Sequence, residues 1–250
     1  MPAHLGNLTA LQTLSAFLVD NDDGRSIREL KNLNGLGGAL RILRLENVSS
    51  EADAEVANLP EKKRLQRLDL RWTTWLSRPS VTGLVVMTLY KCENCELLPS
   101  IGQLPELKFL SIVEMNKVKE IDGTFFRSTD DQVDESFHAF PKLEILEIDI
   151  MLNLIEWMEV KEGDLPSLIK LTMESCPELV TLPSFSSLKC LKYFEVSHCP
   201  KLVSLDRNGL PTSPESLIIR DCPKLEWFDK EGDQDLGLLK SCESCGQSLV

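Results

Sequence analysis

The sequence predicts an α/β solenoid in which short strands stack into one parallel sheet. The stretch from Leu168 to Pro177 reads L-I-K-L-T-M-E-S-C-P, with apolar residues at alternate positions of a short core. The same phrase returns twice, ending at Cys199 and at Cys222, and its leucine spacing can be followed back almost to the first residue. A phrase that returns every ~20–30 residues indicates leucine-rich repeats.

The alternation inside one repeat explains why the repeats must stack. Leu171 and Met173 point to one side of a strand, whereas Lys170, Thr172 and Glu174 point to the other. Each buried apolar side chain contributes roughly 1.5–3 kcal/mol, and only a neighbouring repeat can bury it. We therefore expect an irregular horseshoe with the sheet on its concave face and loops and short helices on its convex face.

The predicted repeats follow one another at uneven intervals. In the second repeat, Leu43 and Leu45 are taken as the inward pair and Arg44 as the outward residue between them. Uneven spacing should give the arc uneven curvature. The expected starting residues are Leu11, Leu40, Leu65, Leu84, Leu107, Leu143, Leu168, Leu191 and Pro214.

Three segments between the strands have a character of their own. A helix is expected from Ser49 to Leu59, with Ser50 as its cap and Pro60 as its end. Residues 124–136 are acidic and polar, which predicts a solvated loop inserted into the repeats. Residues 229–250 form a tail without a clear cap, and the whole of 1–250 is expected to be one repeat domain.

Composition limits the choice of partner and compartment. A net charge of −12 without a basic stripe argues against nucleic acid. No apolar run approaches the ~20 residues of a membrane span. The first ten residues lack the pattern of a signal peptide, so we expect a cytoplasmic chain with reduced cysteines.

A catalytic or metal centre is not expected. The pairs Cys92/Cys95 and Cys242/Cys245 have zinc-like spacing, but most of the solenoid separates them. His198 adjoins Cys199, yet adjacent residues of a strand or turn point apart, so they should not act as a base and a nucleophile. The sequence therefore predicts neither an enzyme nor a cofactor of its own.

Three stretches of the chain are distinctive: Pro2 to Val19, Leu40 to Val48, and C-E-N-C-E-L-L-P-S-I-G-Q-L-P-E-L-K-F-L from Cys92 to Leu110. They resemble the leucine-rich repeat region of plant disease-resistance proteins of the nucleotide-binding, coiled-coil class. The resemblance implies a nucleotide-binding region upstream, since no phosphate loop occurs in this chain. It covers nearly the whole chain and implies a fragment of a longer protein.

The same resemblance implies a recognition scaffold in innate immunity. Its partners would be a pathogen effector or a guarded host protein, together with the nucleotide-binding domain that the repeats restrain. The outward strand residues mix charge with a few aromatics, which are the usual anchors of protein interfaces. The candidate partner-binding residues are Arg44, Arg67, Asp69, Arg71, Thr88, Tyr90, Phe109, Ser111, Glu147, Asp149, Lys170, Thr172, Glu174, Tyr193, Glu195, Ile218 and Arg220.

Two alternatives remain open on the sequence. Asn7-Leu8-Thr9 and Asn47-Val48-Ser49 are glycosylation sequons, which would suit a secreted or receptor-type repeat domain. The missing N-terminal cap, the missing phosphate loop and a shortened centre would suit a truncated, nonfunctional resistance-gene copy.

Overall fold

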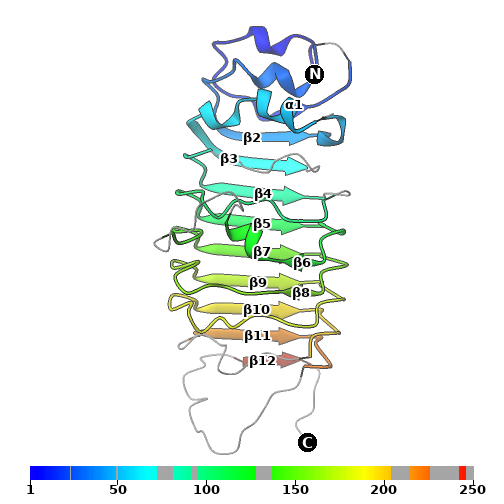
Figure 1. The fold of residues 1–250 in the computed structure, drawn as a ribbon, viewed down its shortest axis with the longest axis vertical. Coiled ribbons are helices and arrows are strands. Elements are labelled where there is room, and N and C mark those ends of the chain that lie inside the picture. The colour runs from blue at the N-terminus through cyan, green and yellow to red at the C-terminus, as the bar shows by residue number, and fades with distance from the viewer. Residues whose placement is uncertain are drawn as a thin grey trace, which may run out of the picture.

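The main sheet is a single run of ten parallel strands (Figure 1). The computed structural model describes residues 1–22, 24–48, 50–71, 81–91, 95–127, 137–203, 214–225 and 242–245. Each strand pairs with the next one along the solenoid, so the predicted leucine-rich repeat fold is confirmed. The strands are β1 (Ala16–Leu18), β2 (Gly37–Leu43), β3 (Arg64–Arg71), β4 (Val86–Tyr90), β5 (Phe109–Val113), β7 (Ile145–Asp149), β9 (Lys170–Glu174), β10 (Tyr193–Ser197), β11 (Ser216–Arg220) and β12 (Cys242–Cys245).

The other elements are short and lie away from the main sheet. A second parallel pair joins β6 (Glu120–Ile121) to β8 (Glu156–Trp157) in the turns that follow β5 and β7. The helices are the 3-10 turns η1 (Leu5–Asn7), η2 (Ile27–Leu30), η3 (Leu45–Asn47) and η4 (Leu59–Glu61), and the α-helices α1 (Glu51–Val56) and α2 (Gly123–Phe126).

The core is one continuous stack of apolar side chains. Leu171 and Met173 of β9 are both fully buried, as the alternation predicts. In-register pairing places their equivalents directly above and below, for example Leu146 of β7 and Phe194 of β10. Each repeat thus buries its apolar pair against both neighbours, and this nearest-neighbour burial supplies most of the stability of such a fold.

The helix expected after Ser49 is present but shorter than predicted. The side chain of Ser50 accepts a hydrogen bond from the backbone N–H of Asp53 at 3.2 Å, which confirms the cap. The α-helix ends at Val56, before Pro60, which lies within η4. Lys62 is fully buried, and its Nζ donates to the carbonyls that follow this helix, those of Ala57 (2.9 Å) and Asn58 (3.1 Å).

The start of the expected acidic insertion belongs to the core. Thr124 to Phe126 lie in α2, and the rings of Phe125 and Phe126 pack on Phe140 with centroids 5.0 and 5.8 Å away. Gly102 lies against this cluster, because its carbonyl accepts from Phe140 N at 2.6 Å. The loop assignment is therefore wrong for residues 124–126, where two phenylalanines outweigh the polar context. Residues 128–136 lie outside the described part of the chain.

A buried ion pair joins the chain on either side of that insertion. Asp164 is 2% exposed and accepts from both terminal nitrogens of Arg127, at 2.6 and 2.8 Å. The same carboxylate accepts from the backbone N–H of Ala139 at 2.9 Å. Arg127 also donates to the carbonyl of Phe137 at 3.3 Å. These bonds fix the two described ends of the insertion against a turn 37 residues further along.

The expected tail contributes a strand. Cys242–Cys245 form β12, which pairs in parallel with β11. The rest of 229–250 lies outside the described residues. The sheet therefore continues one strand beyond the last repeat that the leucine pattern indicates.

The residue that follows a strand adopts a left-handed conformation in repeat after repeat. Glu114, Ser175 and His198 have φ angles of 56°, 56° and 54°, although none is glycine. Their backbone N–H groups donate to the last carbonyl of the next strand, as Ser175 does to Ser197 at 3.0 Å. The turn thus extends the hydrogen-bond ladder past the strand and satisfies donors that would otherwise be unpaired.

Candidate functional site: the concave face

The outward residues of the main sheet form three parallel columns on its concave face. Because the strands pair in register, residues at one strand position line up along the solenoid. The central column is Ala16, Arg41, Asp69, Thr88, Ser111, Glu147, Thr172, Glu195 and Ile218. The column at the strand starts is Ala39, Arg67, Val86, Phe109, Ile145, Lys170, Tyr193 and Ser216. The column at the strand ends is Leu18, Leu43, Arg71, Tyr90, Val113, Asp149, Glu174, Ser197 and Arg220.

Sixteen of the seventeen candidate residues lie in these columns, and Arg44 does not. Arg41 holds the central position of β2, opposite Asp69, whereas Arg44 follows the strand with φ 59°. The segment L-R-I-L-R-L contains two apolar-Arg-apolar triplets, and the register with β3 selects Leu40 and Ile42 as the inward pair. The placement of Arg44 between two inward leucines is therefore corrected.

Several apolar and small residues of the same face are not among the candidates predicted from the sequence. Val86 and Ile145 lie on either side of Phe109 in one column, and Val113 lies between Tyr90 and Asp149 in another. The alternation of each strand could have placed them, but they carry no charge or aromatic ring to draw attention. Ser111, at the centre of the face, is only 8% exposed.

The first part of the face is basic. Arg41 and Arg67 lie on either side of Asp69, at 3.8 and 3.1 Å from its carboxylate. Arg71 adds a further guanidinium in the column at the strand ends. These three arginines, which we call the basic patch, outnumber the one carboxylate among them.

The later part of the face is acidic. Glu147, Asp149 and Glu174, which we call the acidic patch, occupy adjacent positions on β7 and β9. Partial burial, with the nearby charges of Glu174 and Glu114, raises the pKa of Asp149 above its usual range. Lys91 and His198 lie at the edge of the acidic patch, 4.0 Å from Glu114 and 3.9 Å from Glu174. Among the described residues, Glu147 and Asp149 therefore form no ion pair, whereas Glu174 has His198 beside it.

Three cysteines stack behind the strand ends. Cys176, Cys199 and Cys222, the thiol stack, are buried free thiols in successive repeats. The thiol of Cys199 donates to the carbonyl of Ser197 at 3.3 Å, and its interaction with the neighbouring thiol of Cys176, together with burial, raises its pKa to about 12. Protonated, buried thiols are poor nucleophiles and metal ligands. Cys95 differs, since the structure gives it a disulfide bond, against the expectation of reduced cysteines.

His198 and Cys199 point apart, as predicted. Cys199 is fully buried, whereas the His198 side chain is 55% exposed and lies 3.1 Å from the carboxylate of Asp221. Within the described residues, no group of three or more histidine, cysteine or acidic side chains is arranged to hold a metal ion. None of the described helices is long and apolar enough to cross a bilayer.

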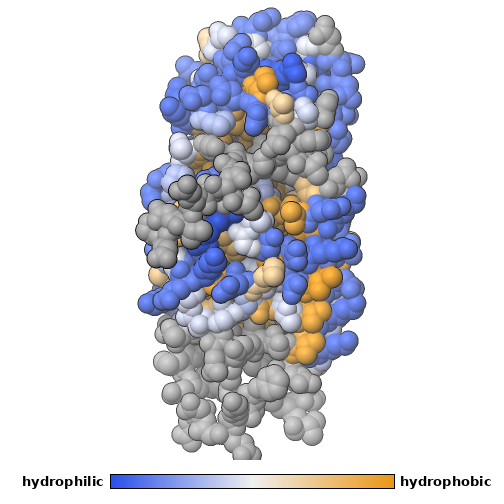
Figure 2. Space-filling view, in the orientation of Figure 1, coloured by the Kyte–Doolittle hydropathy of each residue, from blue (hydrophilic) through white to orange (hydrophobic). Residues whose placement is uncertain are grey.

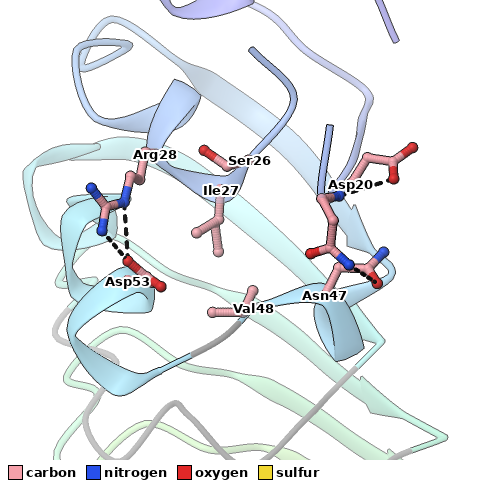
Figure 3. Close-up of a pocket in the computed structure, with 8 residues that line it drawn as sticks. Asp20, Ser26, Ile27, Arg28, Asn47, Val48 and Asp53 are labelled. Atoms are coloured by element: carbon pink, nitrogen blue, oxygen red, sulfur yellow. Dashed lines mark hydrogen bonds and ion pairs between the residues drawn. The ribbon is translucent and has the colours of Figure 1, made fainter. Parts of the chain in front are cut away.

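A small pocket lies near the N-terminal end, apart from the concave face (Figure 3). It measures about 220 Å³. Arg28 and Asp53 pair across one side of it, and this hydrogen bond lowers the pKa of Asp53. Asn47 donates to the carbonyl of Val19 at 3.0 Å and accepts from Asn21. Arg28, Asp53, Asn21 and Asn47 thus already have hydrogen-bond partners within or beside the pocket.

Apolar surface also gathers along the side of the solenoid where the strands end, in the half that contains β9 to β11 (Figure 2). Ile155, Val180 and Val203 occupy one position in successive turns, and Val180 N donates to the carbonyl of Ile155 at 2.7 Å. Leu152 and Met158, from the turns after β7, are about half exposed. Nothing in the described residues indicates what would bind there.

Comparison with known proteins supports a single family. The model of the R13L1/DRL21 leucine-rich repeats matches residues 27–74 and 73–115. The putative disease resistance RPP13-like protein 1 of Arabidopsis thaliana is 36% identical over 220 residues, covering 68% of this chain and 21% of that protein. The putative disease resistance protein RGA1 of Solanum bulbocastanum is 29% identical over 229 residues, covering 76% and 22%. The chain thus spans about a fifth of the length of these curated relatives.

Solved structures show only a loose likeness. The leucine-rich repeat domain of the type III effector XopL aligns with a TM-score of 0.41 and 21% identity, over 66% of this chain and 64% of that one. The fold assignment therefore rests on the strand order itself. With its stacked repeats and its matches to resistance proteins of two plants, the chain belongs to the leucine-rich repeat family of plant disease resistance proteins.

Proposed function

We propose that this chain is a protein-recognition scaffold of plant innate immunity and that its concave face binds the partner. The observation that carries the proposal is the regular array of exposed or half-exposed charged and aromatic side chains over successive strands. Tyr90 and Tyr193 are each about 40% exposed on this face. Rigid aromatics among charged groups suit an interface in which a few anchors supply most of the affinity.

The partner in this proposal is a pathogen effector or a guarded host protein in the cytoplasm. In this proposal the repeats also restrain an adjoining nucleotide-binding domain in its inactive state. The partner favours the active state of the whole protein, whereas the contact with the nucleotide-binding domain favours the inactive state. A partner can shift that equilibrium only by its difference in affinity for the two states. The names of the relatives, all disease resistance proteins, support the immune context.

Charge reversal on the concave face tests the recognition role. Glu147→Lys with Glu195→Lys changes two central residues, and Glu159→Lys with Glu162→Lys is the matched control in an exposed turn. The immobilised chain captures proteins from pathogen-challenged leaf extract, and each captured protein is then purified and titrated against all three forms. We expect Kd to rise about tenfold or more for the concave variant only. Equal affinity for all three forms would reject the concave face.

The restraining role has a separate test. The purified chain is mixed with the nucleotide-binding region of a disease resistance relative, and nucleotide release is followed by fluorescence. We expect slower release in the presence of the chain, because restraint favours the inactive, nucleotide-retaining state. An unchanged release rate across a saturating concentration range would contradict this role and leave the recognition role standing.

A further inference from the structure

The charge on the concave face changes sign along the solenoid. The basic patch lies on β2 and β3, and the acidic patch lies on β7 and β9. In the column at the strand ends, Arg71 and Asp149 are separated by Tyr90 and Val113. That is three strand spacings, or about 14 Å at roughly 4.8 Å per strand.

An apolar row lies between the two patches. Val86, Phe109 and Ile145 are direct neighbours on β4, β5 and β7, and each is partly exposed. Ser111 and Thr88 lie beside them at the centre of the face, where short side chains leave the apolar row accessible from above. In the column at the strand ends, the face presents positive charge, apolar and aromatic surface, and negative charge in that order, from Arg71 through Tyr90 and Val113 to Asp149. In the column of the apolar row, Lys170 follows Ile145.

The carboxylates of the acidic patch favour binding of a positively charged residue of a partner. Within the described residues, neither Glu147 nor Asp149 has a basic nitrogen within ion-pair distance. By contrast, Glu195 pairs with Arg220 at 3.1 Å. Burial and the nearby charges of Glu174 and Glu114 raise the pKa of Asp149, and a lysine or arginine of a partner would favour its charged form.

We propose that this face binds an extended segment of a partner protein that carries an acidic residue, an apolar or aromatic residue and a basic residue at positions i, i+2 and i+4. In an extended chain, alternate side chains share one face and stand about 6.6 Å apart, so i to i+4 spans about 13 Å. This length matches the separation of the two patches. The segment crosses the strands, with its acidic residue over β3 and its basic residue over β7. The inference rests on the proposed recognition function and names the chemistry of its partner.

A peptide titration tests the order of chemistry. The probe is a fluorescein-labelled nine-residue peptide with Glu, Trp and Lys at alternate positions and serine elsewhere. A second peptide of identical composition places Trp outside the two charged residues. We expect the first peptide to bind the full chain at least about fivefold more tightly by fluorescence anisotropy, because only its order fits the face. Equal affinities, or no binding of the first peptide, would overturn the inference.

Variants of the chain then locate the binding. Glu147→Gln with Asp149→Asn should weaken binding of the first peptide about tenfold, whereas Glu159→Gln with Glu162→Gln removes the same charge elsewhere and should leave Kd unchanged. Circular dichroism verifies that both variants are folded. If the two variants weakened binding of the first peptide equally, the effect would come from net charge alone, and the inference would be overturned. If the peptides fail while captured host proteins still respond to Glu147 and Glu195, the recognition function stands and only this partner chemistry is wrong.

Discussion

Replacing Gly102 with alanine probes how rigidly the phenylalanine cluster supports the convex side. A Cβ at this position would lie 2.1 Å from the carbonyl oxygen of Phe126 and 2.8 Å from its carbonyl carbon. Non-bonded heavy atoms prefer about 3.5 Å, so the Phe126 backbone would have to retreat by roughly 1.4 Å. It has no free space, because both rings of α2 are buried against Phe140.

Forcing an extra methyl group into a packed core costs typically 1–3 kcal/mol, and more where backbone must move. We therefore expect Gly102→Ala to lose about 3 kcal/mol. For a chain of this size the expected fall in Tm is about 6–12 °C by differential scanning calorimetry. Urea titration followed by circular dichroism gives the free energy independently.

Gly123→Ala is the matched control within α2. Nothing lies within 4 Å of its added Cβ, and its φ angle is ordinary. Alanine should be neutral or stabilise the helix by up to about 1 kcal/mol. The packing argument would be refuted if Gly102→Ala melted within about 3 °C of the wild type, or if Gly123→Ala lost as much stability as Gly102→Ala.

Four further predictions follow from other contacts. Asp164→Asn should lower the free energy of unfolding in urea by about 2–4 kcal/mol, because it leaves the Arg127 guanidinium without its buried, charged partner. A double-mutant cycle with Arg127→Gln that shows no coupling energy would contradict this prediction. Burial lowers the pKa of Lys62 to about 8 from 10.5, although its carbonyl partners favour the charged form. Between these pH values the unfolded chain binds more protons than the folded chain, so the free energy of unfolding should rise with pH across that window. Lys62→Met should reduce this rise by about 1–3 kcal/mol, and identical pH profiles for the variant and the wild type would disprove the argument. Ser175→Gly should stabilise the chain by about 0.5–1 kcal/mol because φ is 56°, whereas Ser175→Val should destabilise it, as thermal melts of both can establish. Iodoacetamide should modify the exposed Cys190 and spare the thiol stack, and mass spectrometry showing equal labelling would argue against buried, protonated thiols.

The alternation of apolar residues predicted the fold and most of the concave face because both depend on local period. Leu171 and Met173 could be assigned inward from their own strand. The frame of β2 could not be assigned this way, because Leu40-Arg41-Ile42 and Leu43-Arg44-Leu45 satisfy the same pattern. Pairing with the neighbouring strands β1 and β3 distinguishes them.

Contacts between distant turns were also beyond the sequence. Asp164 and Arg127 are separated by 37 residues and belong to no repeating pattern. The burial of Phe125 and Phe126 was hidden by the acidic stretch that follows them. The chemical order of the concave face emerged only when the register aligned Val86 with Phe109 and Ile145.

The register of the main sheet has a consequence for how such repeat proteins could diversify. Since the described strands of the main sheet hydrogen-bond only to the strands next to them in the stack, a whole repeat could be gained or lost without changing the pairing of the others. One added repeat between β4 and β5 would lengthen the gap between the two charged patches by a single step of about 4.8 Å and change no contact residue. The number of repeats would then set the distance between the two charged patches, and each added repeat would select a partner segment longer by one or two residues.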